Sequence, residues 1–517
     1  MRASWFRASL ITLAALSATA CIWIFRGVKV APVDPSADST AITSPVKAHL
    51  VDGTTIVYAH GVVIARDTVR GVGARFDITG NSTTVAERVP LDSVVAMEDL
   101  LPVVHAGPTV AVSTFTTAIG VVAAAGLAVA IFGSCPTVYS DSAGTPVMEG
   151  EAFSYSIAPL FERRDVFRLR AQPDARGVLS LEVRNEALET HYINHLQLLE
   201  VRHGADEVVM PDAAGHPLAL SGIMHPARIA DRSGHDLRPI LAGDDSLVFR
   251  TDSGTIANAS LPDLDDYIDL AMPAPRGADS VAVVFNLRNS LLNTVLLYDV
   301  VLGPQGAHAI DWLAGDLSRI GNAVAMGRWY GSRMGMHIAV WRNGRYEPAA
   351  YVPDAGPIAW RRVAAVVPVP PLDTLRLRLT FIADQWRIGS LAIATRMRRP
   401  TPRVIALSGV RSSDVAADSA AERNLHDSDE RYLVTSSGQR FTARFDTGRP
   451  TADSSRTFLL ASQGYYLEWI RRDWIRAARG HQSFAPSDSA LLTGLREWGR
   501  VHEDFERRFE NTRIPVR

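Results

Sequence analysis

The chain has 517 residues, of which 47% are hydrophobic and 21% charged, which is typical of folded globular protein and long enough for several domains. The formal net charge at pH 7 is only -2, so the overall charge does not favour a nucleic-acid partner. Two cysteines exclude a disulfide framework.

Residues 1–30 predict a signal peptide or a membrane anchor. Arg2 and Arg7 flank the start of an apolar run, ASLITLAALSATACIWIF. Three alternatives remain open: lipidation of Cys21 in a sequence similar to a lipobox, retention of the apolar run as an anchor, and cleavage after Ala20. Each alternative exports the following residues or ties them to a membrane, so we expect a membrane-associated protein of the bacterial cell envelope.

The next two segments differ in amino-acid composition. Residues 31–47 are rich in Pro, Ser, Thr and Ala and predict a linker. Residues 48–100 consist of short β-branched runs separated by Gly and Asp, which predict a small β-barrel-like domain of tight hairpins.

A long uncharged segment follows. Residues 100–140 contain no Asp, Glu, Lys or Arg, and a helix over 109–132 would be about 36 Å long, enough to cross a membrane. Gly120, Ala124 and Ala128 form a stripe of small residues that would allow close contact between helices. We expect a transmembrane helix over 109–132; the alternative is a buried, alanine-rich core helix.

The largest part of the chain predicts antiparallel β-structure. Apolar and polar residues alternate in runs such as 293–303 and 336–352, which are expected to form strands. We expect a β-sandwich domain over 137–305 and a jelly-roll-like β domain over 306–400, with a helix near 307–325 between them. The predicted fold class is therefore mainly β, built of antiparallel sandwich and jelly-roll-like domains.

Residues 401–517 predict a short β unit followed by amphipathic helices. Ser487 is a suitable cap for the last helix, on which apolar residues recur every three or four positions. Such a stripe either packs on its own domain or binds another protein. The candidate partner-binding side chains are aromatic: Trp469, Trp474, Trp498, Phe505 and Phe509.

Three segments carry a resemblance to a family. GSCPTVYS at 133–140, LEVRNEALETHYINHLQLLEVRH at 181–203 and RTFLLASQGYYLEWIRRDW at 456–474 are similar to those of a family of bacterial cell-envelope proteins, often lipoproteins. The resemblance spans residues 48–517 and implies an N-terminal signal, a small β unit and a hydrophobic segment before the SCP motif. It implies no activity and assigns no functional residue.

The sequence contains few residues that could form a metal or catalytic site. His191 and His195 would point to the same face of a strand and are the weak candidates for a metal site, but their spacing matches no known metal motif. We expect no cofactor. The favoured hypothesis is a membrane-tethered, non-enzymatic β-sandwich protein that binds or scaffolds a protein or glycan partner; the alternative is a metal-dependent hydrolase that acts on an envelope polymer.

Overall fold

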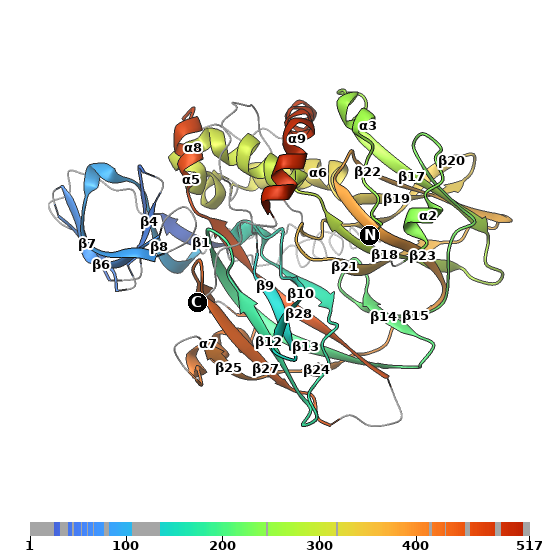
Figure 1. The fold of residues 1–517 in the computed structure, drawn as a ribbon, viewed down its shortest axis with the longest axis horizontal. Coiled ribbons are helices and arrows are strands. Elements are labelled where there is room, and N and C mark those ends of the chain that lie inside the picture. Colours follow the sequence, from blue (N-terminus) through green and yellow to red (C-terminus); the bar gives the residue numbers. More distant parts are fainter. Residues whose placement is uncertain are drawn as a thin grey trace, which may run out of the picture.

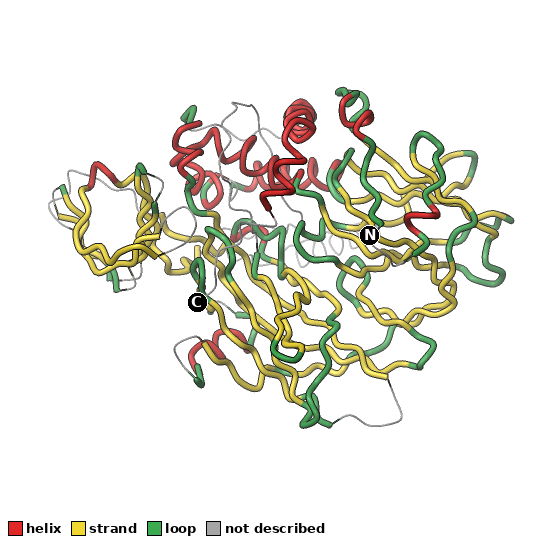
Figure 2. Tube along the Cα trace, viewed as in Figure 1, coloured by secondary structure: helices red, strands yellow, loops and turns green. Residues whose placement is uncertain are grey.

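The computed structural model describes residues 25–30, 40–43, 46–52, 54–58, 60–65, 67–76, 82–105, 135–243, 247–316, 319–412, 416–429, 431–449, 455–480 and 487–509. Cys21 and the predicted membrane helix at 109–132, with Gly120, Ala124 and Ala128, lie outside these residues. Within them, no helix is both long and apolar enough to cross a membrane. The described chain is mainly β, and its sheets are antiparallel (Figures 1 and 2).

The N-terminal unit is a curled, barrel-like sheet (Figure 1). Its strands pair in the order β1-β8-β3-β4-β6-β5-β2, with β7 on β6. Its core consists mainly of aliphatic side chains such as Val46, Ile56 and Val69. The elements are β1 (Phe25–Val30), β2 (Thr40–Ile42), β3 (Val46–Leu50), β4 (Thr55–Tyr58), β5 (Val62–Ala65), β6 (Thr68–Phe76), β7 (Ser82–Pro90), η1 (Leu91–Ser93) and β8 (Val94–His105).

This unit is larger than the predicted domain at 48–100. Strand β1 lies in the segment expected to be signal or anchor, and β2 lies in the expected linker at 31–47. β1 pairs along β8, with Phe25 opposite His105. The apolar run of the predicted signal concealed β1, and the Pro- and Ser-rich composition of the predicted linker concealed β2. Pairing with a partner strand, rather than local hydrophobic periodicity, stabilises both.

The first sandwich consists of two five-stranded sheets that share one core, to which Leu181 and Phe445 contribute from one sheet and Leu198 and Leu460 from the other. One sheet contains, in spatial order, β10 (Thr145–Glu151), β9 (Thr137–Ser142), β12 (Val178–Arg184), β27 (Arg440–Asp446) and β25 (Leu407–Ser412). The other contains β11 (Arg163–Arg168), β28 (Ser455–Glu468), β13 (Glu189–His203) and β24 (Arg403–Ile405), with β26 (Leu433–Thr435) also paired to β13.

The second sandwich also has two five-stranded sheets around a shared core, which includes Phe285 and Leu379. One sheet contains β14 (Val208–Pro211), β15 (Pro217–Met224), β23 (Trp386–Arg398), β18 (Ser280–Asn289) and β21 (Arg361–Pro368). The other contains β16 (Arg228–Asp231), β17 (Asp265–Pro273), β22 (Thr374–Ile382), β19 (Met336–Arg342) and β20 (Arg345–Val352).

The order of these strands corrects the predicted domain boundaries. The second sandwich, at 208–398, lies in the chain between β13 and β24 of the first, so the first sandwich is discontinuous. Boundaries at 305/306 and 400/401 would separate β18 from β21 and β13 from β28, which are paired strands. Alternation identifies a strand, but it does not identify the strand's partner, and this is why the insertion was missed.

Helices gather along one side of the two sandwiches (Figures 1 and 2). This helical layer contains α4 (Leu292–Val295), η3 (Leu296–Leu302), η4 (Gly303–His308), α5 (Ala309–Ala314), α6 (Ile320–Arg333), α8 (Arg472–Ala477) and α9 (Asp488–Phe509). The remaining helices are η2 (Pro159–Phe161), α2 (Arg238–Leu241), α3 (Ser253–Ala257) and α7 (Ser419–His426). The predicted strand at 293–303 is therefore wrong, whereas the helix expected near 307–325 corresponds to α5 and part of α6.

Candidate functional site

A buried polar cluster forms where three distant segments of the chain meet. β13 and β28 pair so that Glu189 lies opposite Glu468, and His191 opposite Tyr466. Residues two apart on a strand point to one face of the sheet, so these four side chains share a face. Cys135, just before β9, lies close enough to act electrostatically on Tyr466. All five side chains are at most 2% exposed, and they belong to the three segments that carry the family resemblance.

Hydrogen bonds and one ion pair connect the cluster. His191 Nε2 lies 2.7 Å from Glu189 Oε1. Glu468 accepts a hydrogen bond from the Tyr298 hydroxyl and lies 2.7 Å from the Arg471 guanidinium. Glu189 Oε2 has no hydrogen-bond partner among the described residues, although Glu468 lies close enough to act on the Glu189 pKa. Two carboxyl groups that lie close together disfavour each other's ionisation.

The pKa values agree with this arrangement. Burial raises the pKa of Glu189 well above its usual range and that of Glu468 to about 7, although the Arg471 charge opposes both shifts. Burial lowers the pKa of His191 to about 3. At neutral pH, therefore, His191 is neutral, and the raised pKa of Glu189 favours its protonated form.

Glu151 connects this cluster to a neighbouring cavity. Its Oε1 accepts a hydrogen bond from Cys135 Sγ at 3.3 Å, and its Oε2 accepts two from the backbone amides of Ile358 and Ala359, each at 2.8 Å. Burial raises its pKa to about 7, although these amides oppose the shift. Burial also raises the pKa of the Cys135 thiol, so this thiol stays protonated and is a poor nucleophile.

The backbone around Glu151 adopts uncommon conformations. Cys135 and Phe153 are buried residues with positive φ angles of 77° and 41°. Gly356 has φ +92°, and a Cβ atom there would lie 2.7 Å from Glu151 Oε2 and 2.6 Å from Ser154 Oγ. Such strain costs free energy and persists only where the surrounding structure enforces it. Position 356 therefore requires glycine, which allows the chain to approach Glu151 closely.

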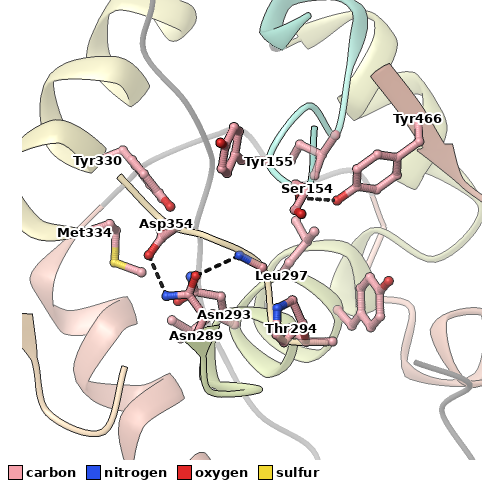
Figure 3. A pocket seen from close by; sticks show the side chains of 15 residues that line it. Ser154, Tyr155, Asn289, Asn293, Thr294, Leu297, Tyr330, Met334, Asp354 and Tyr466 are labelled. Carbon is pink, nitrogen blue, oxygen red and sulfur yellow. Dashed lines mark hydrogen bonds between the residues drawn. The ribbon is translucent and has the colours of Figure 1, made fainter. Parts of the chain in front are cut away.

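A cavity of about 70 Å³ lies beside Glu151, where the two sandwiches meet the helical layer. Figure 3 shows the side chains around it. The first sandwich and its loops contribute Ser154, Tyr155, Ile157 and Tyr466; the helical layer contributes Asn293, Thr294, Leu296, Leu297, Tyr298, Tyr330 and Met334; the second sandwich contributes Asn289, Asp354, Gly356 and Pro357. Ligand sites commonly occupy such junctions.

Asp354 is the acidic residue in the cavity wall, and only one of its oxygens is satisfied. Its Oδ1 accepts hydrogen bonds from Asn289 Nδ2 and Gln385 Nε2, both at 2.8 Å. Its Oδ2 is buried without a hydrogen-bond partner. Burial raises the pKa of Asp354 to about 6, so the group is mostly ionised at neutral pH. A buried carboxylate oxygen with no partner is costly, and a bound ligand would remove that cost.

A second cavity, of about 150 Å³, lies in the second sandwich beside α3. Its acidic groups are satisfied within the protein. Asp266 Oδ2 accepts a hydrogen bond from Thr251, Asp252 accepts from the first turn of α3, and Asp231 accepts from His235. This larger cavity therefore has no acid comparable with Asp354.

The predicted relation between His191 and His195 is wrong. A β-bulge between Ile193 and His195 shifts the register, so that His191 lies opposite Tyr466 and His195 opposite Gln463. Positions 463 and 466 point to opposite faces of β28, and hence so do the two histidines. In the part of the chain that the structure describes, no three His, Cys, Asp or Glu residues are grouped to hold a metal ion. The arrangement on which the hydrolase hypothesis depended is thus not present.

The predicted partner-binding aromatic residues pack inside the protein. Trp469, Trp474 and Trp498 are 1%, 3% and 0% exposed, so they are not available as a binding surface. Trp474 and Trp498 pack the C-terminal helices on the core of the first sandwich, whereas Trp469 packs against Leu188 and against Phe76 of the barrel. Phe505 is partly buried against the same core, and the side chain of Phe509 lies outside the described residues.

Sequence reasoning missed Asp354 and the residues that hold it. Asn289 ends β18, Asp354 follows β20 and Gln385 precedes β23, so they are far apart in the chain and form no motif. The one available signal was the turn composition of PDAGP at 353–357, which places an acid in a loop.

No protein-family model and no curated protein matches this sequence. The family resemblance thus stays an expectation, and function has to be argued from the geometry.

Proposed function

We propose that this chain is a non-catalytic binding protein of the bacterial envelope, whose cavity at the junction of the sandwiches takes a small polar ligand or the end of a larger protein or glycan. One observation carries the proposal: Asp354 Oδ2 is buried in the cavity wall without a partner, while Oδ1 is held by two amides. The carboxylate is thus held in one orientation with Oδ2 unpartnered, although the Asn293 side chain lies close enough to lower the Asp354 pKa.

The neighbouring groups favour binding over catalysis. The Cys135 thiol is protonated and both Glu151 oxygens accept hydrogen bonds from the protein. His191 is neutral and in contact with Glu189. A nucleophile needs an activating base, and an acid–base group needs access to the substrate. These buried groups are instead engaged with one another.

The cavity also suits a binding protein because of what surrounds it. The β18 end, the loop after β20, the loop before β11 and the helical layer all contribute to its wall. A ligand there contacts both sandwiches at once and would hold them in one arrangement. Binding should accordingly raise the unfolding temperature of the whole protein.

The test is a thermal-shift screen of the full-length protein with amino acids, monosaccharides and small amines. Each compound that stabilises the protein is then titrated against Thr294→Phe, which fills the cavity from α4. Thr255→Phe is the matched control, because Thr255 is an equally half-buried threonine that lines the second cavity. We expect Thr294→Phe to abolish the shift and Thr255→Phe to keep it. Equal effects of both variants, or no stabilising compound, would refute the proposal.

Attachment to the envelope is the second part of the proposal, and it depends on the apolar segments at 8–25 and 109–132. An uncharged helix of that length satisfies its own backbone groups in lipid. A protein that lacks residues 1–24 should still sediment with membranes after carbonate washing, whereas one in which 109–132 is also replaced by a polar linker should not. Release of both proteins would leave the N-terminal segment as the anchor.

A further inference from the structure

We infer that the ligand of this cavity carries a protonated amine, which binds Asp354 Oδ2 among the surrounding tyrosine rings. The inference rests on the proposed binding function and specifies the chemistry of its ligand. It follows from three properties of the wall: which polar atoms remain open, what charge they carry, and which rings surround them.

Among the described residues, two buried polar atoms of the wall lack a hydrogen-bond partner, and both are acceptors. Asn289 Nδ2 donates to Asp354, and Asn289 Oδ1 accepts from the backbone amides of Ala355 and Gly356 at 2.6 and 3.0 Å. Asp354 Oδ2 is left open, as is the amide oxygen of Asn293 in its assigned orientation. A ligand that satisfies such atoms must donate hydrogen bonds.

Two of the wall's tyrosine hydroxyls are already committed. Tyr466 donates to the backbone oxygen of Ser154 at 2.9 Å, as Figure 3 shows, and Tyr298 donates to Glu468. Neither is free to meet a ligand's acceptor groups as a donor. These two hydroxyls therefore offer nothing to an anionic ligand, because anions need donors that point at them.

The charge of the wall is negative. No Lys, Arg or His lines the cavity in the described part of the chain. The nearby Arg163 does act on Asp354 through space, but its guanidinium stacks 3.3 Å from the ring centre of Tyr155. Asp354 thus lacks a contacting counter-ion, and a cationic donor forms a stronger hydrogen bond with it than a neutral hydroxyl would.

Aromatic rings complete the site. Tyr155, Tyr298, Tyr330 and Tyr466 all contribute to the wall, and Figure 3 shows Tyr330 on the same side as Asp354. Arg163 already lies over the ring of Tyr155 and Arg471 over that of Tyr298, so we assign the ring of Tyr330 to the ligand. Ring faces attract cations, most strongly where water is excluded. A cavity of about 70 Å³ is suited to the end of a chain, so the ligand is a small primary amine or the amine terminus of a longer molecule.

The experiment compares three probes of similar size: propylammonium chloride, 1-propanol and sodium propionate. Each is titrated into the full-length protein by calorimetry at neutral pH. We expect propylammonium to bind at least about tenfold more tightly than the other two, which is the effect of one charge-assisted hydrogen bond. Asp354→Asn should remove that preference. The control Asp266→Asn should keep it, since Asp266 is a buried aspartate with a raised pKa that lines only the second cavity.

A second pair of variants covers the case in which Asp354→Asn fails to fold. Tyr330→Leu removes a ring from the wall and should weaken propylammonium binding severalfold, whereas Tyr330→Phe keeps the ring and should retain it. Equal binding of propanol and propylammonium, or equal binding to Tyr330→Leu and Tyr330→Phe, would overturn the inference. If a neutral ligand binds and Thr294→Phe prevents its binding, the inference of an amine ligand is refuted but the proposed binding function is not. If the cavity binds no ligand, and only water contacts Asp354 Oδ2, both the inference and the proposed function are refuted.

Discussion

Lys47 Nζ donates a hydrogen bond to Thr190 Oγ1 over 3.0 Å, although Lys47 belongs to the N-terminal barrel and Thr190 to strand β13. Both residues are completely buried. The ammonium also lies 5.2 Å from the ring centre of Trp469, whose Nε1 donates to the same threonine. A lysine of the barrel thus inserts beside the buried polar cluster and fixes one unit to the other.

Lys47→Ala should therefore loosen the barrel. The variant loses a buried hydrogen bond and leaves a space beside Trp469, which together cost about 2–4 kcal/mol. Limited proteolysis should detect faster cleavage within residues 25–105. Arg70→Ala is the control, since Arg70 is exposed on β6, and it should remain within about 0.5 kcal/mol of the parent. Unchanged proteolysis of Lys47→Ala would mean that the contact does not hold the barrel.

Trp498→Ala should destabilise the protein strongly. Trp498 is 0% exposed on α9, its Nε1 donates to Asp384 Oδ2 at 2.7 Å, and its ring meets Phe505 edge to face. Loss of such a side chain costs about 3–5 kcal/mol. Chemical unfolding measures this cost against Trp360→Ala, which truncates a tryptophan that is 39% exposed. Similar losses in the two variants would contradict the burial of Trp498.

Glu189→Gln should change how stability depends on pH. The folded-state pKa of Glu189 is raised, so the native state binds this proton more tightly than the unfolded chain does. Its contribution is complete below the unfolded value of about 4.5 and is lost as pH rises towards the folded pKa, by at most about 1.4 kcal/mol per pH unit. Glutamine mimics the protonated form and removes this loss.

The difference in unfolding free energy between Glu189→Gln and the parent should therefore shift in favour of the variant as pH rises from about 5 to about 8. His191 gives the opposite trend, because its lowered pKa makes stability fall as pH decreases through about 6.5, but it is present in both proteins. Glu503→Gln, an exposed substitution on α9, should show a constant difference. A constant difference for Glu189→Gln would show that this carboxyl is ionised in the native protein.

Gly356→Ala should be more harmful than Gly234→Ala, although the two glycines have similar φ angles of +92° and +88°. Alanine at either position suffers the same backbone strain of about 1 kcal/mol or more. At 356 its Cβ would also meet Glu151 and Ser154, whereas nothing lies within 4 Å at 234. The difference between the two melting temperatures measures the crowding beside Glu151. Equal melting temperatures would show that the loop can move away from that acid.

Local features of the fold could be predicted where the residues that determine them lie close together in the sequence. The alternating run at 336–352 forms β19 and β20, and Asn343 and Gly344 supply the positive φ angles of their tight turn. Ser487 caps α9, as predicted, by accepting a hydrogen bond from the Ala490 amide at 3.3 Å. In both cases residues a few positions apart interact, so local chemistry is sufficient.

The segment 293–303 is a case in which the local sequence pattern predicted the wrong secondary structure. Its apolar residues are interrupted by Asp299, which is exposed in the structure. Over so short a run, periodicity alone does not distinguish a strand from a helix. The structure has α4 and η3 there, with Leu292, Val295 and Leu296 completely or almost completely buried. α9 packs closely on this segment at Gly494, where a Cβ atom would lie only 1.8 Å from Leu296.

By itself, the sequence determined that the fold would be mainly antiparallel β-sheet, because alternating apolar and polar residues give each strand one apolar face. Only the tertiary structure decided which strands pair, that the second sandwich is inserted into the first, and that a bulge beside Asn194 turns His191 and His195 to opposite faces. The open oxygen of Asp354 belongs to the same category. It exists because Asn289 and Gln385, 65 and 31 positions away, converge on the other oxygen, and contacts over such separations depend on the packing of whole sheets.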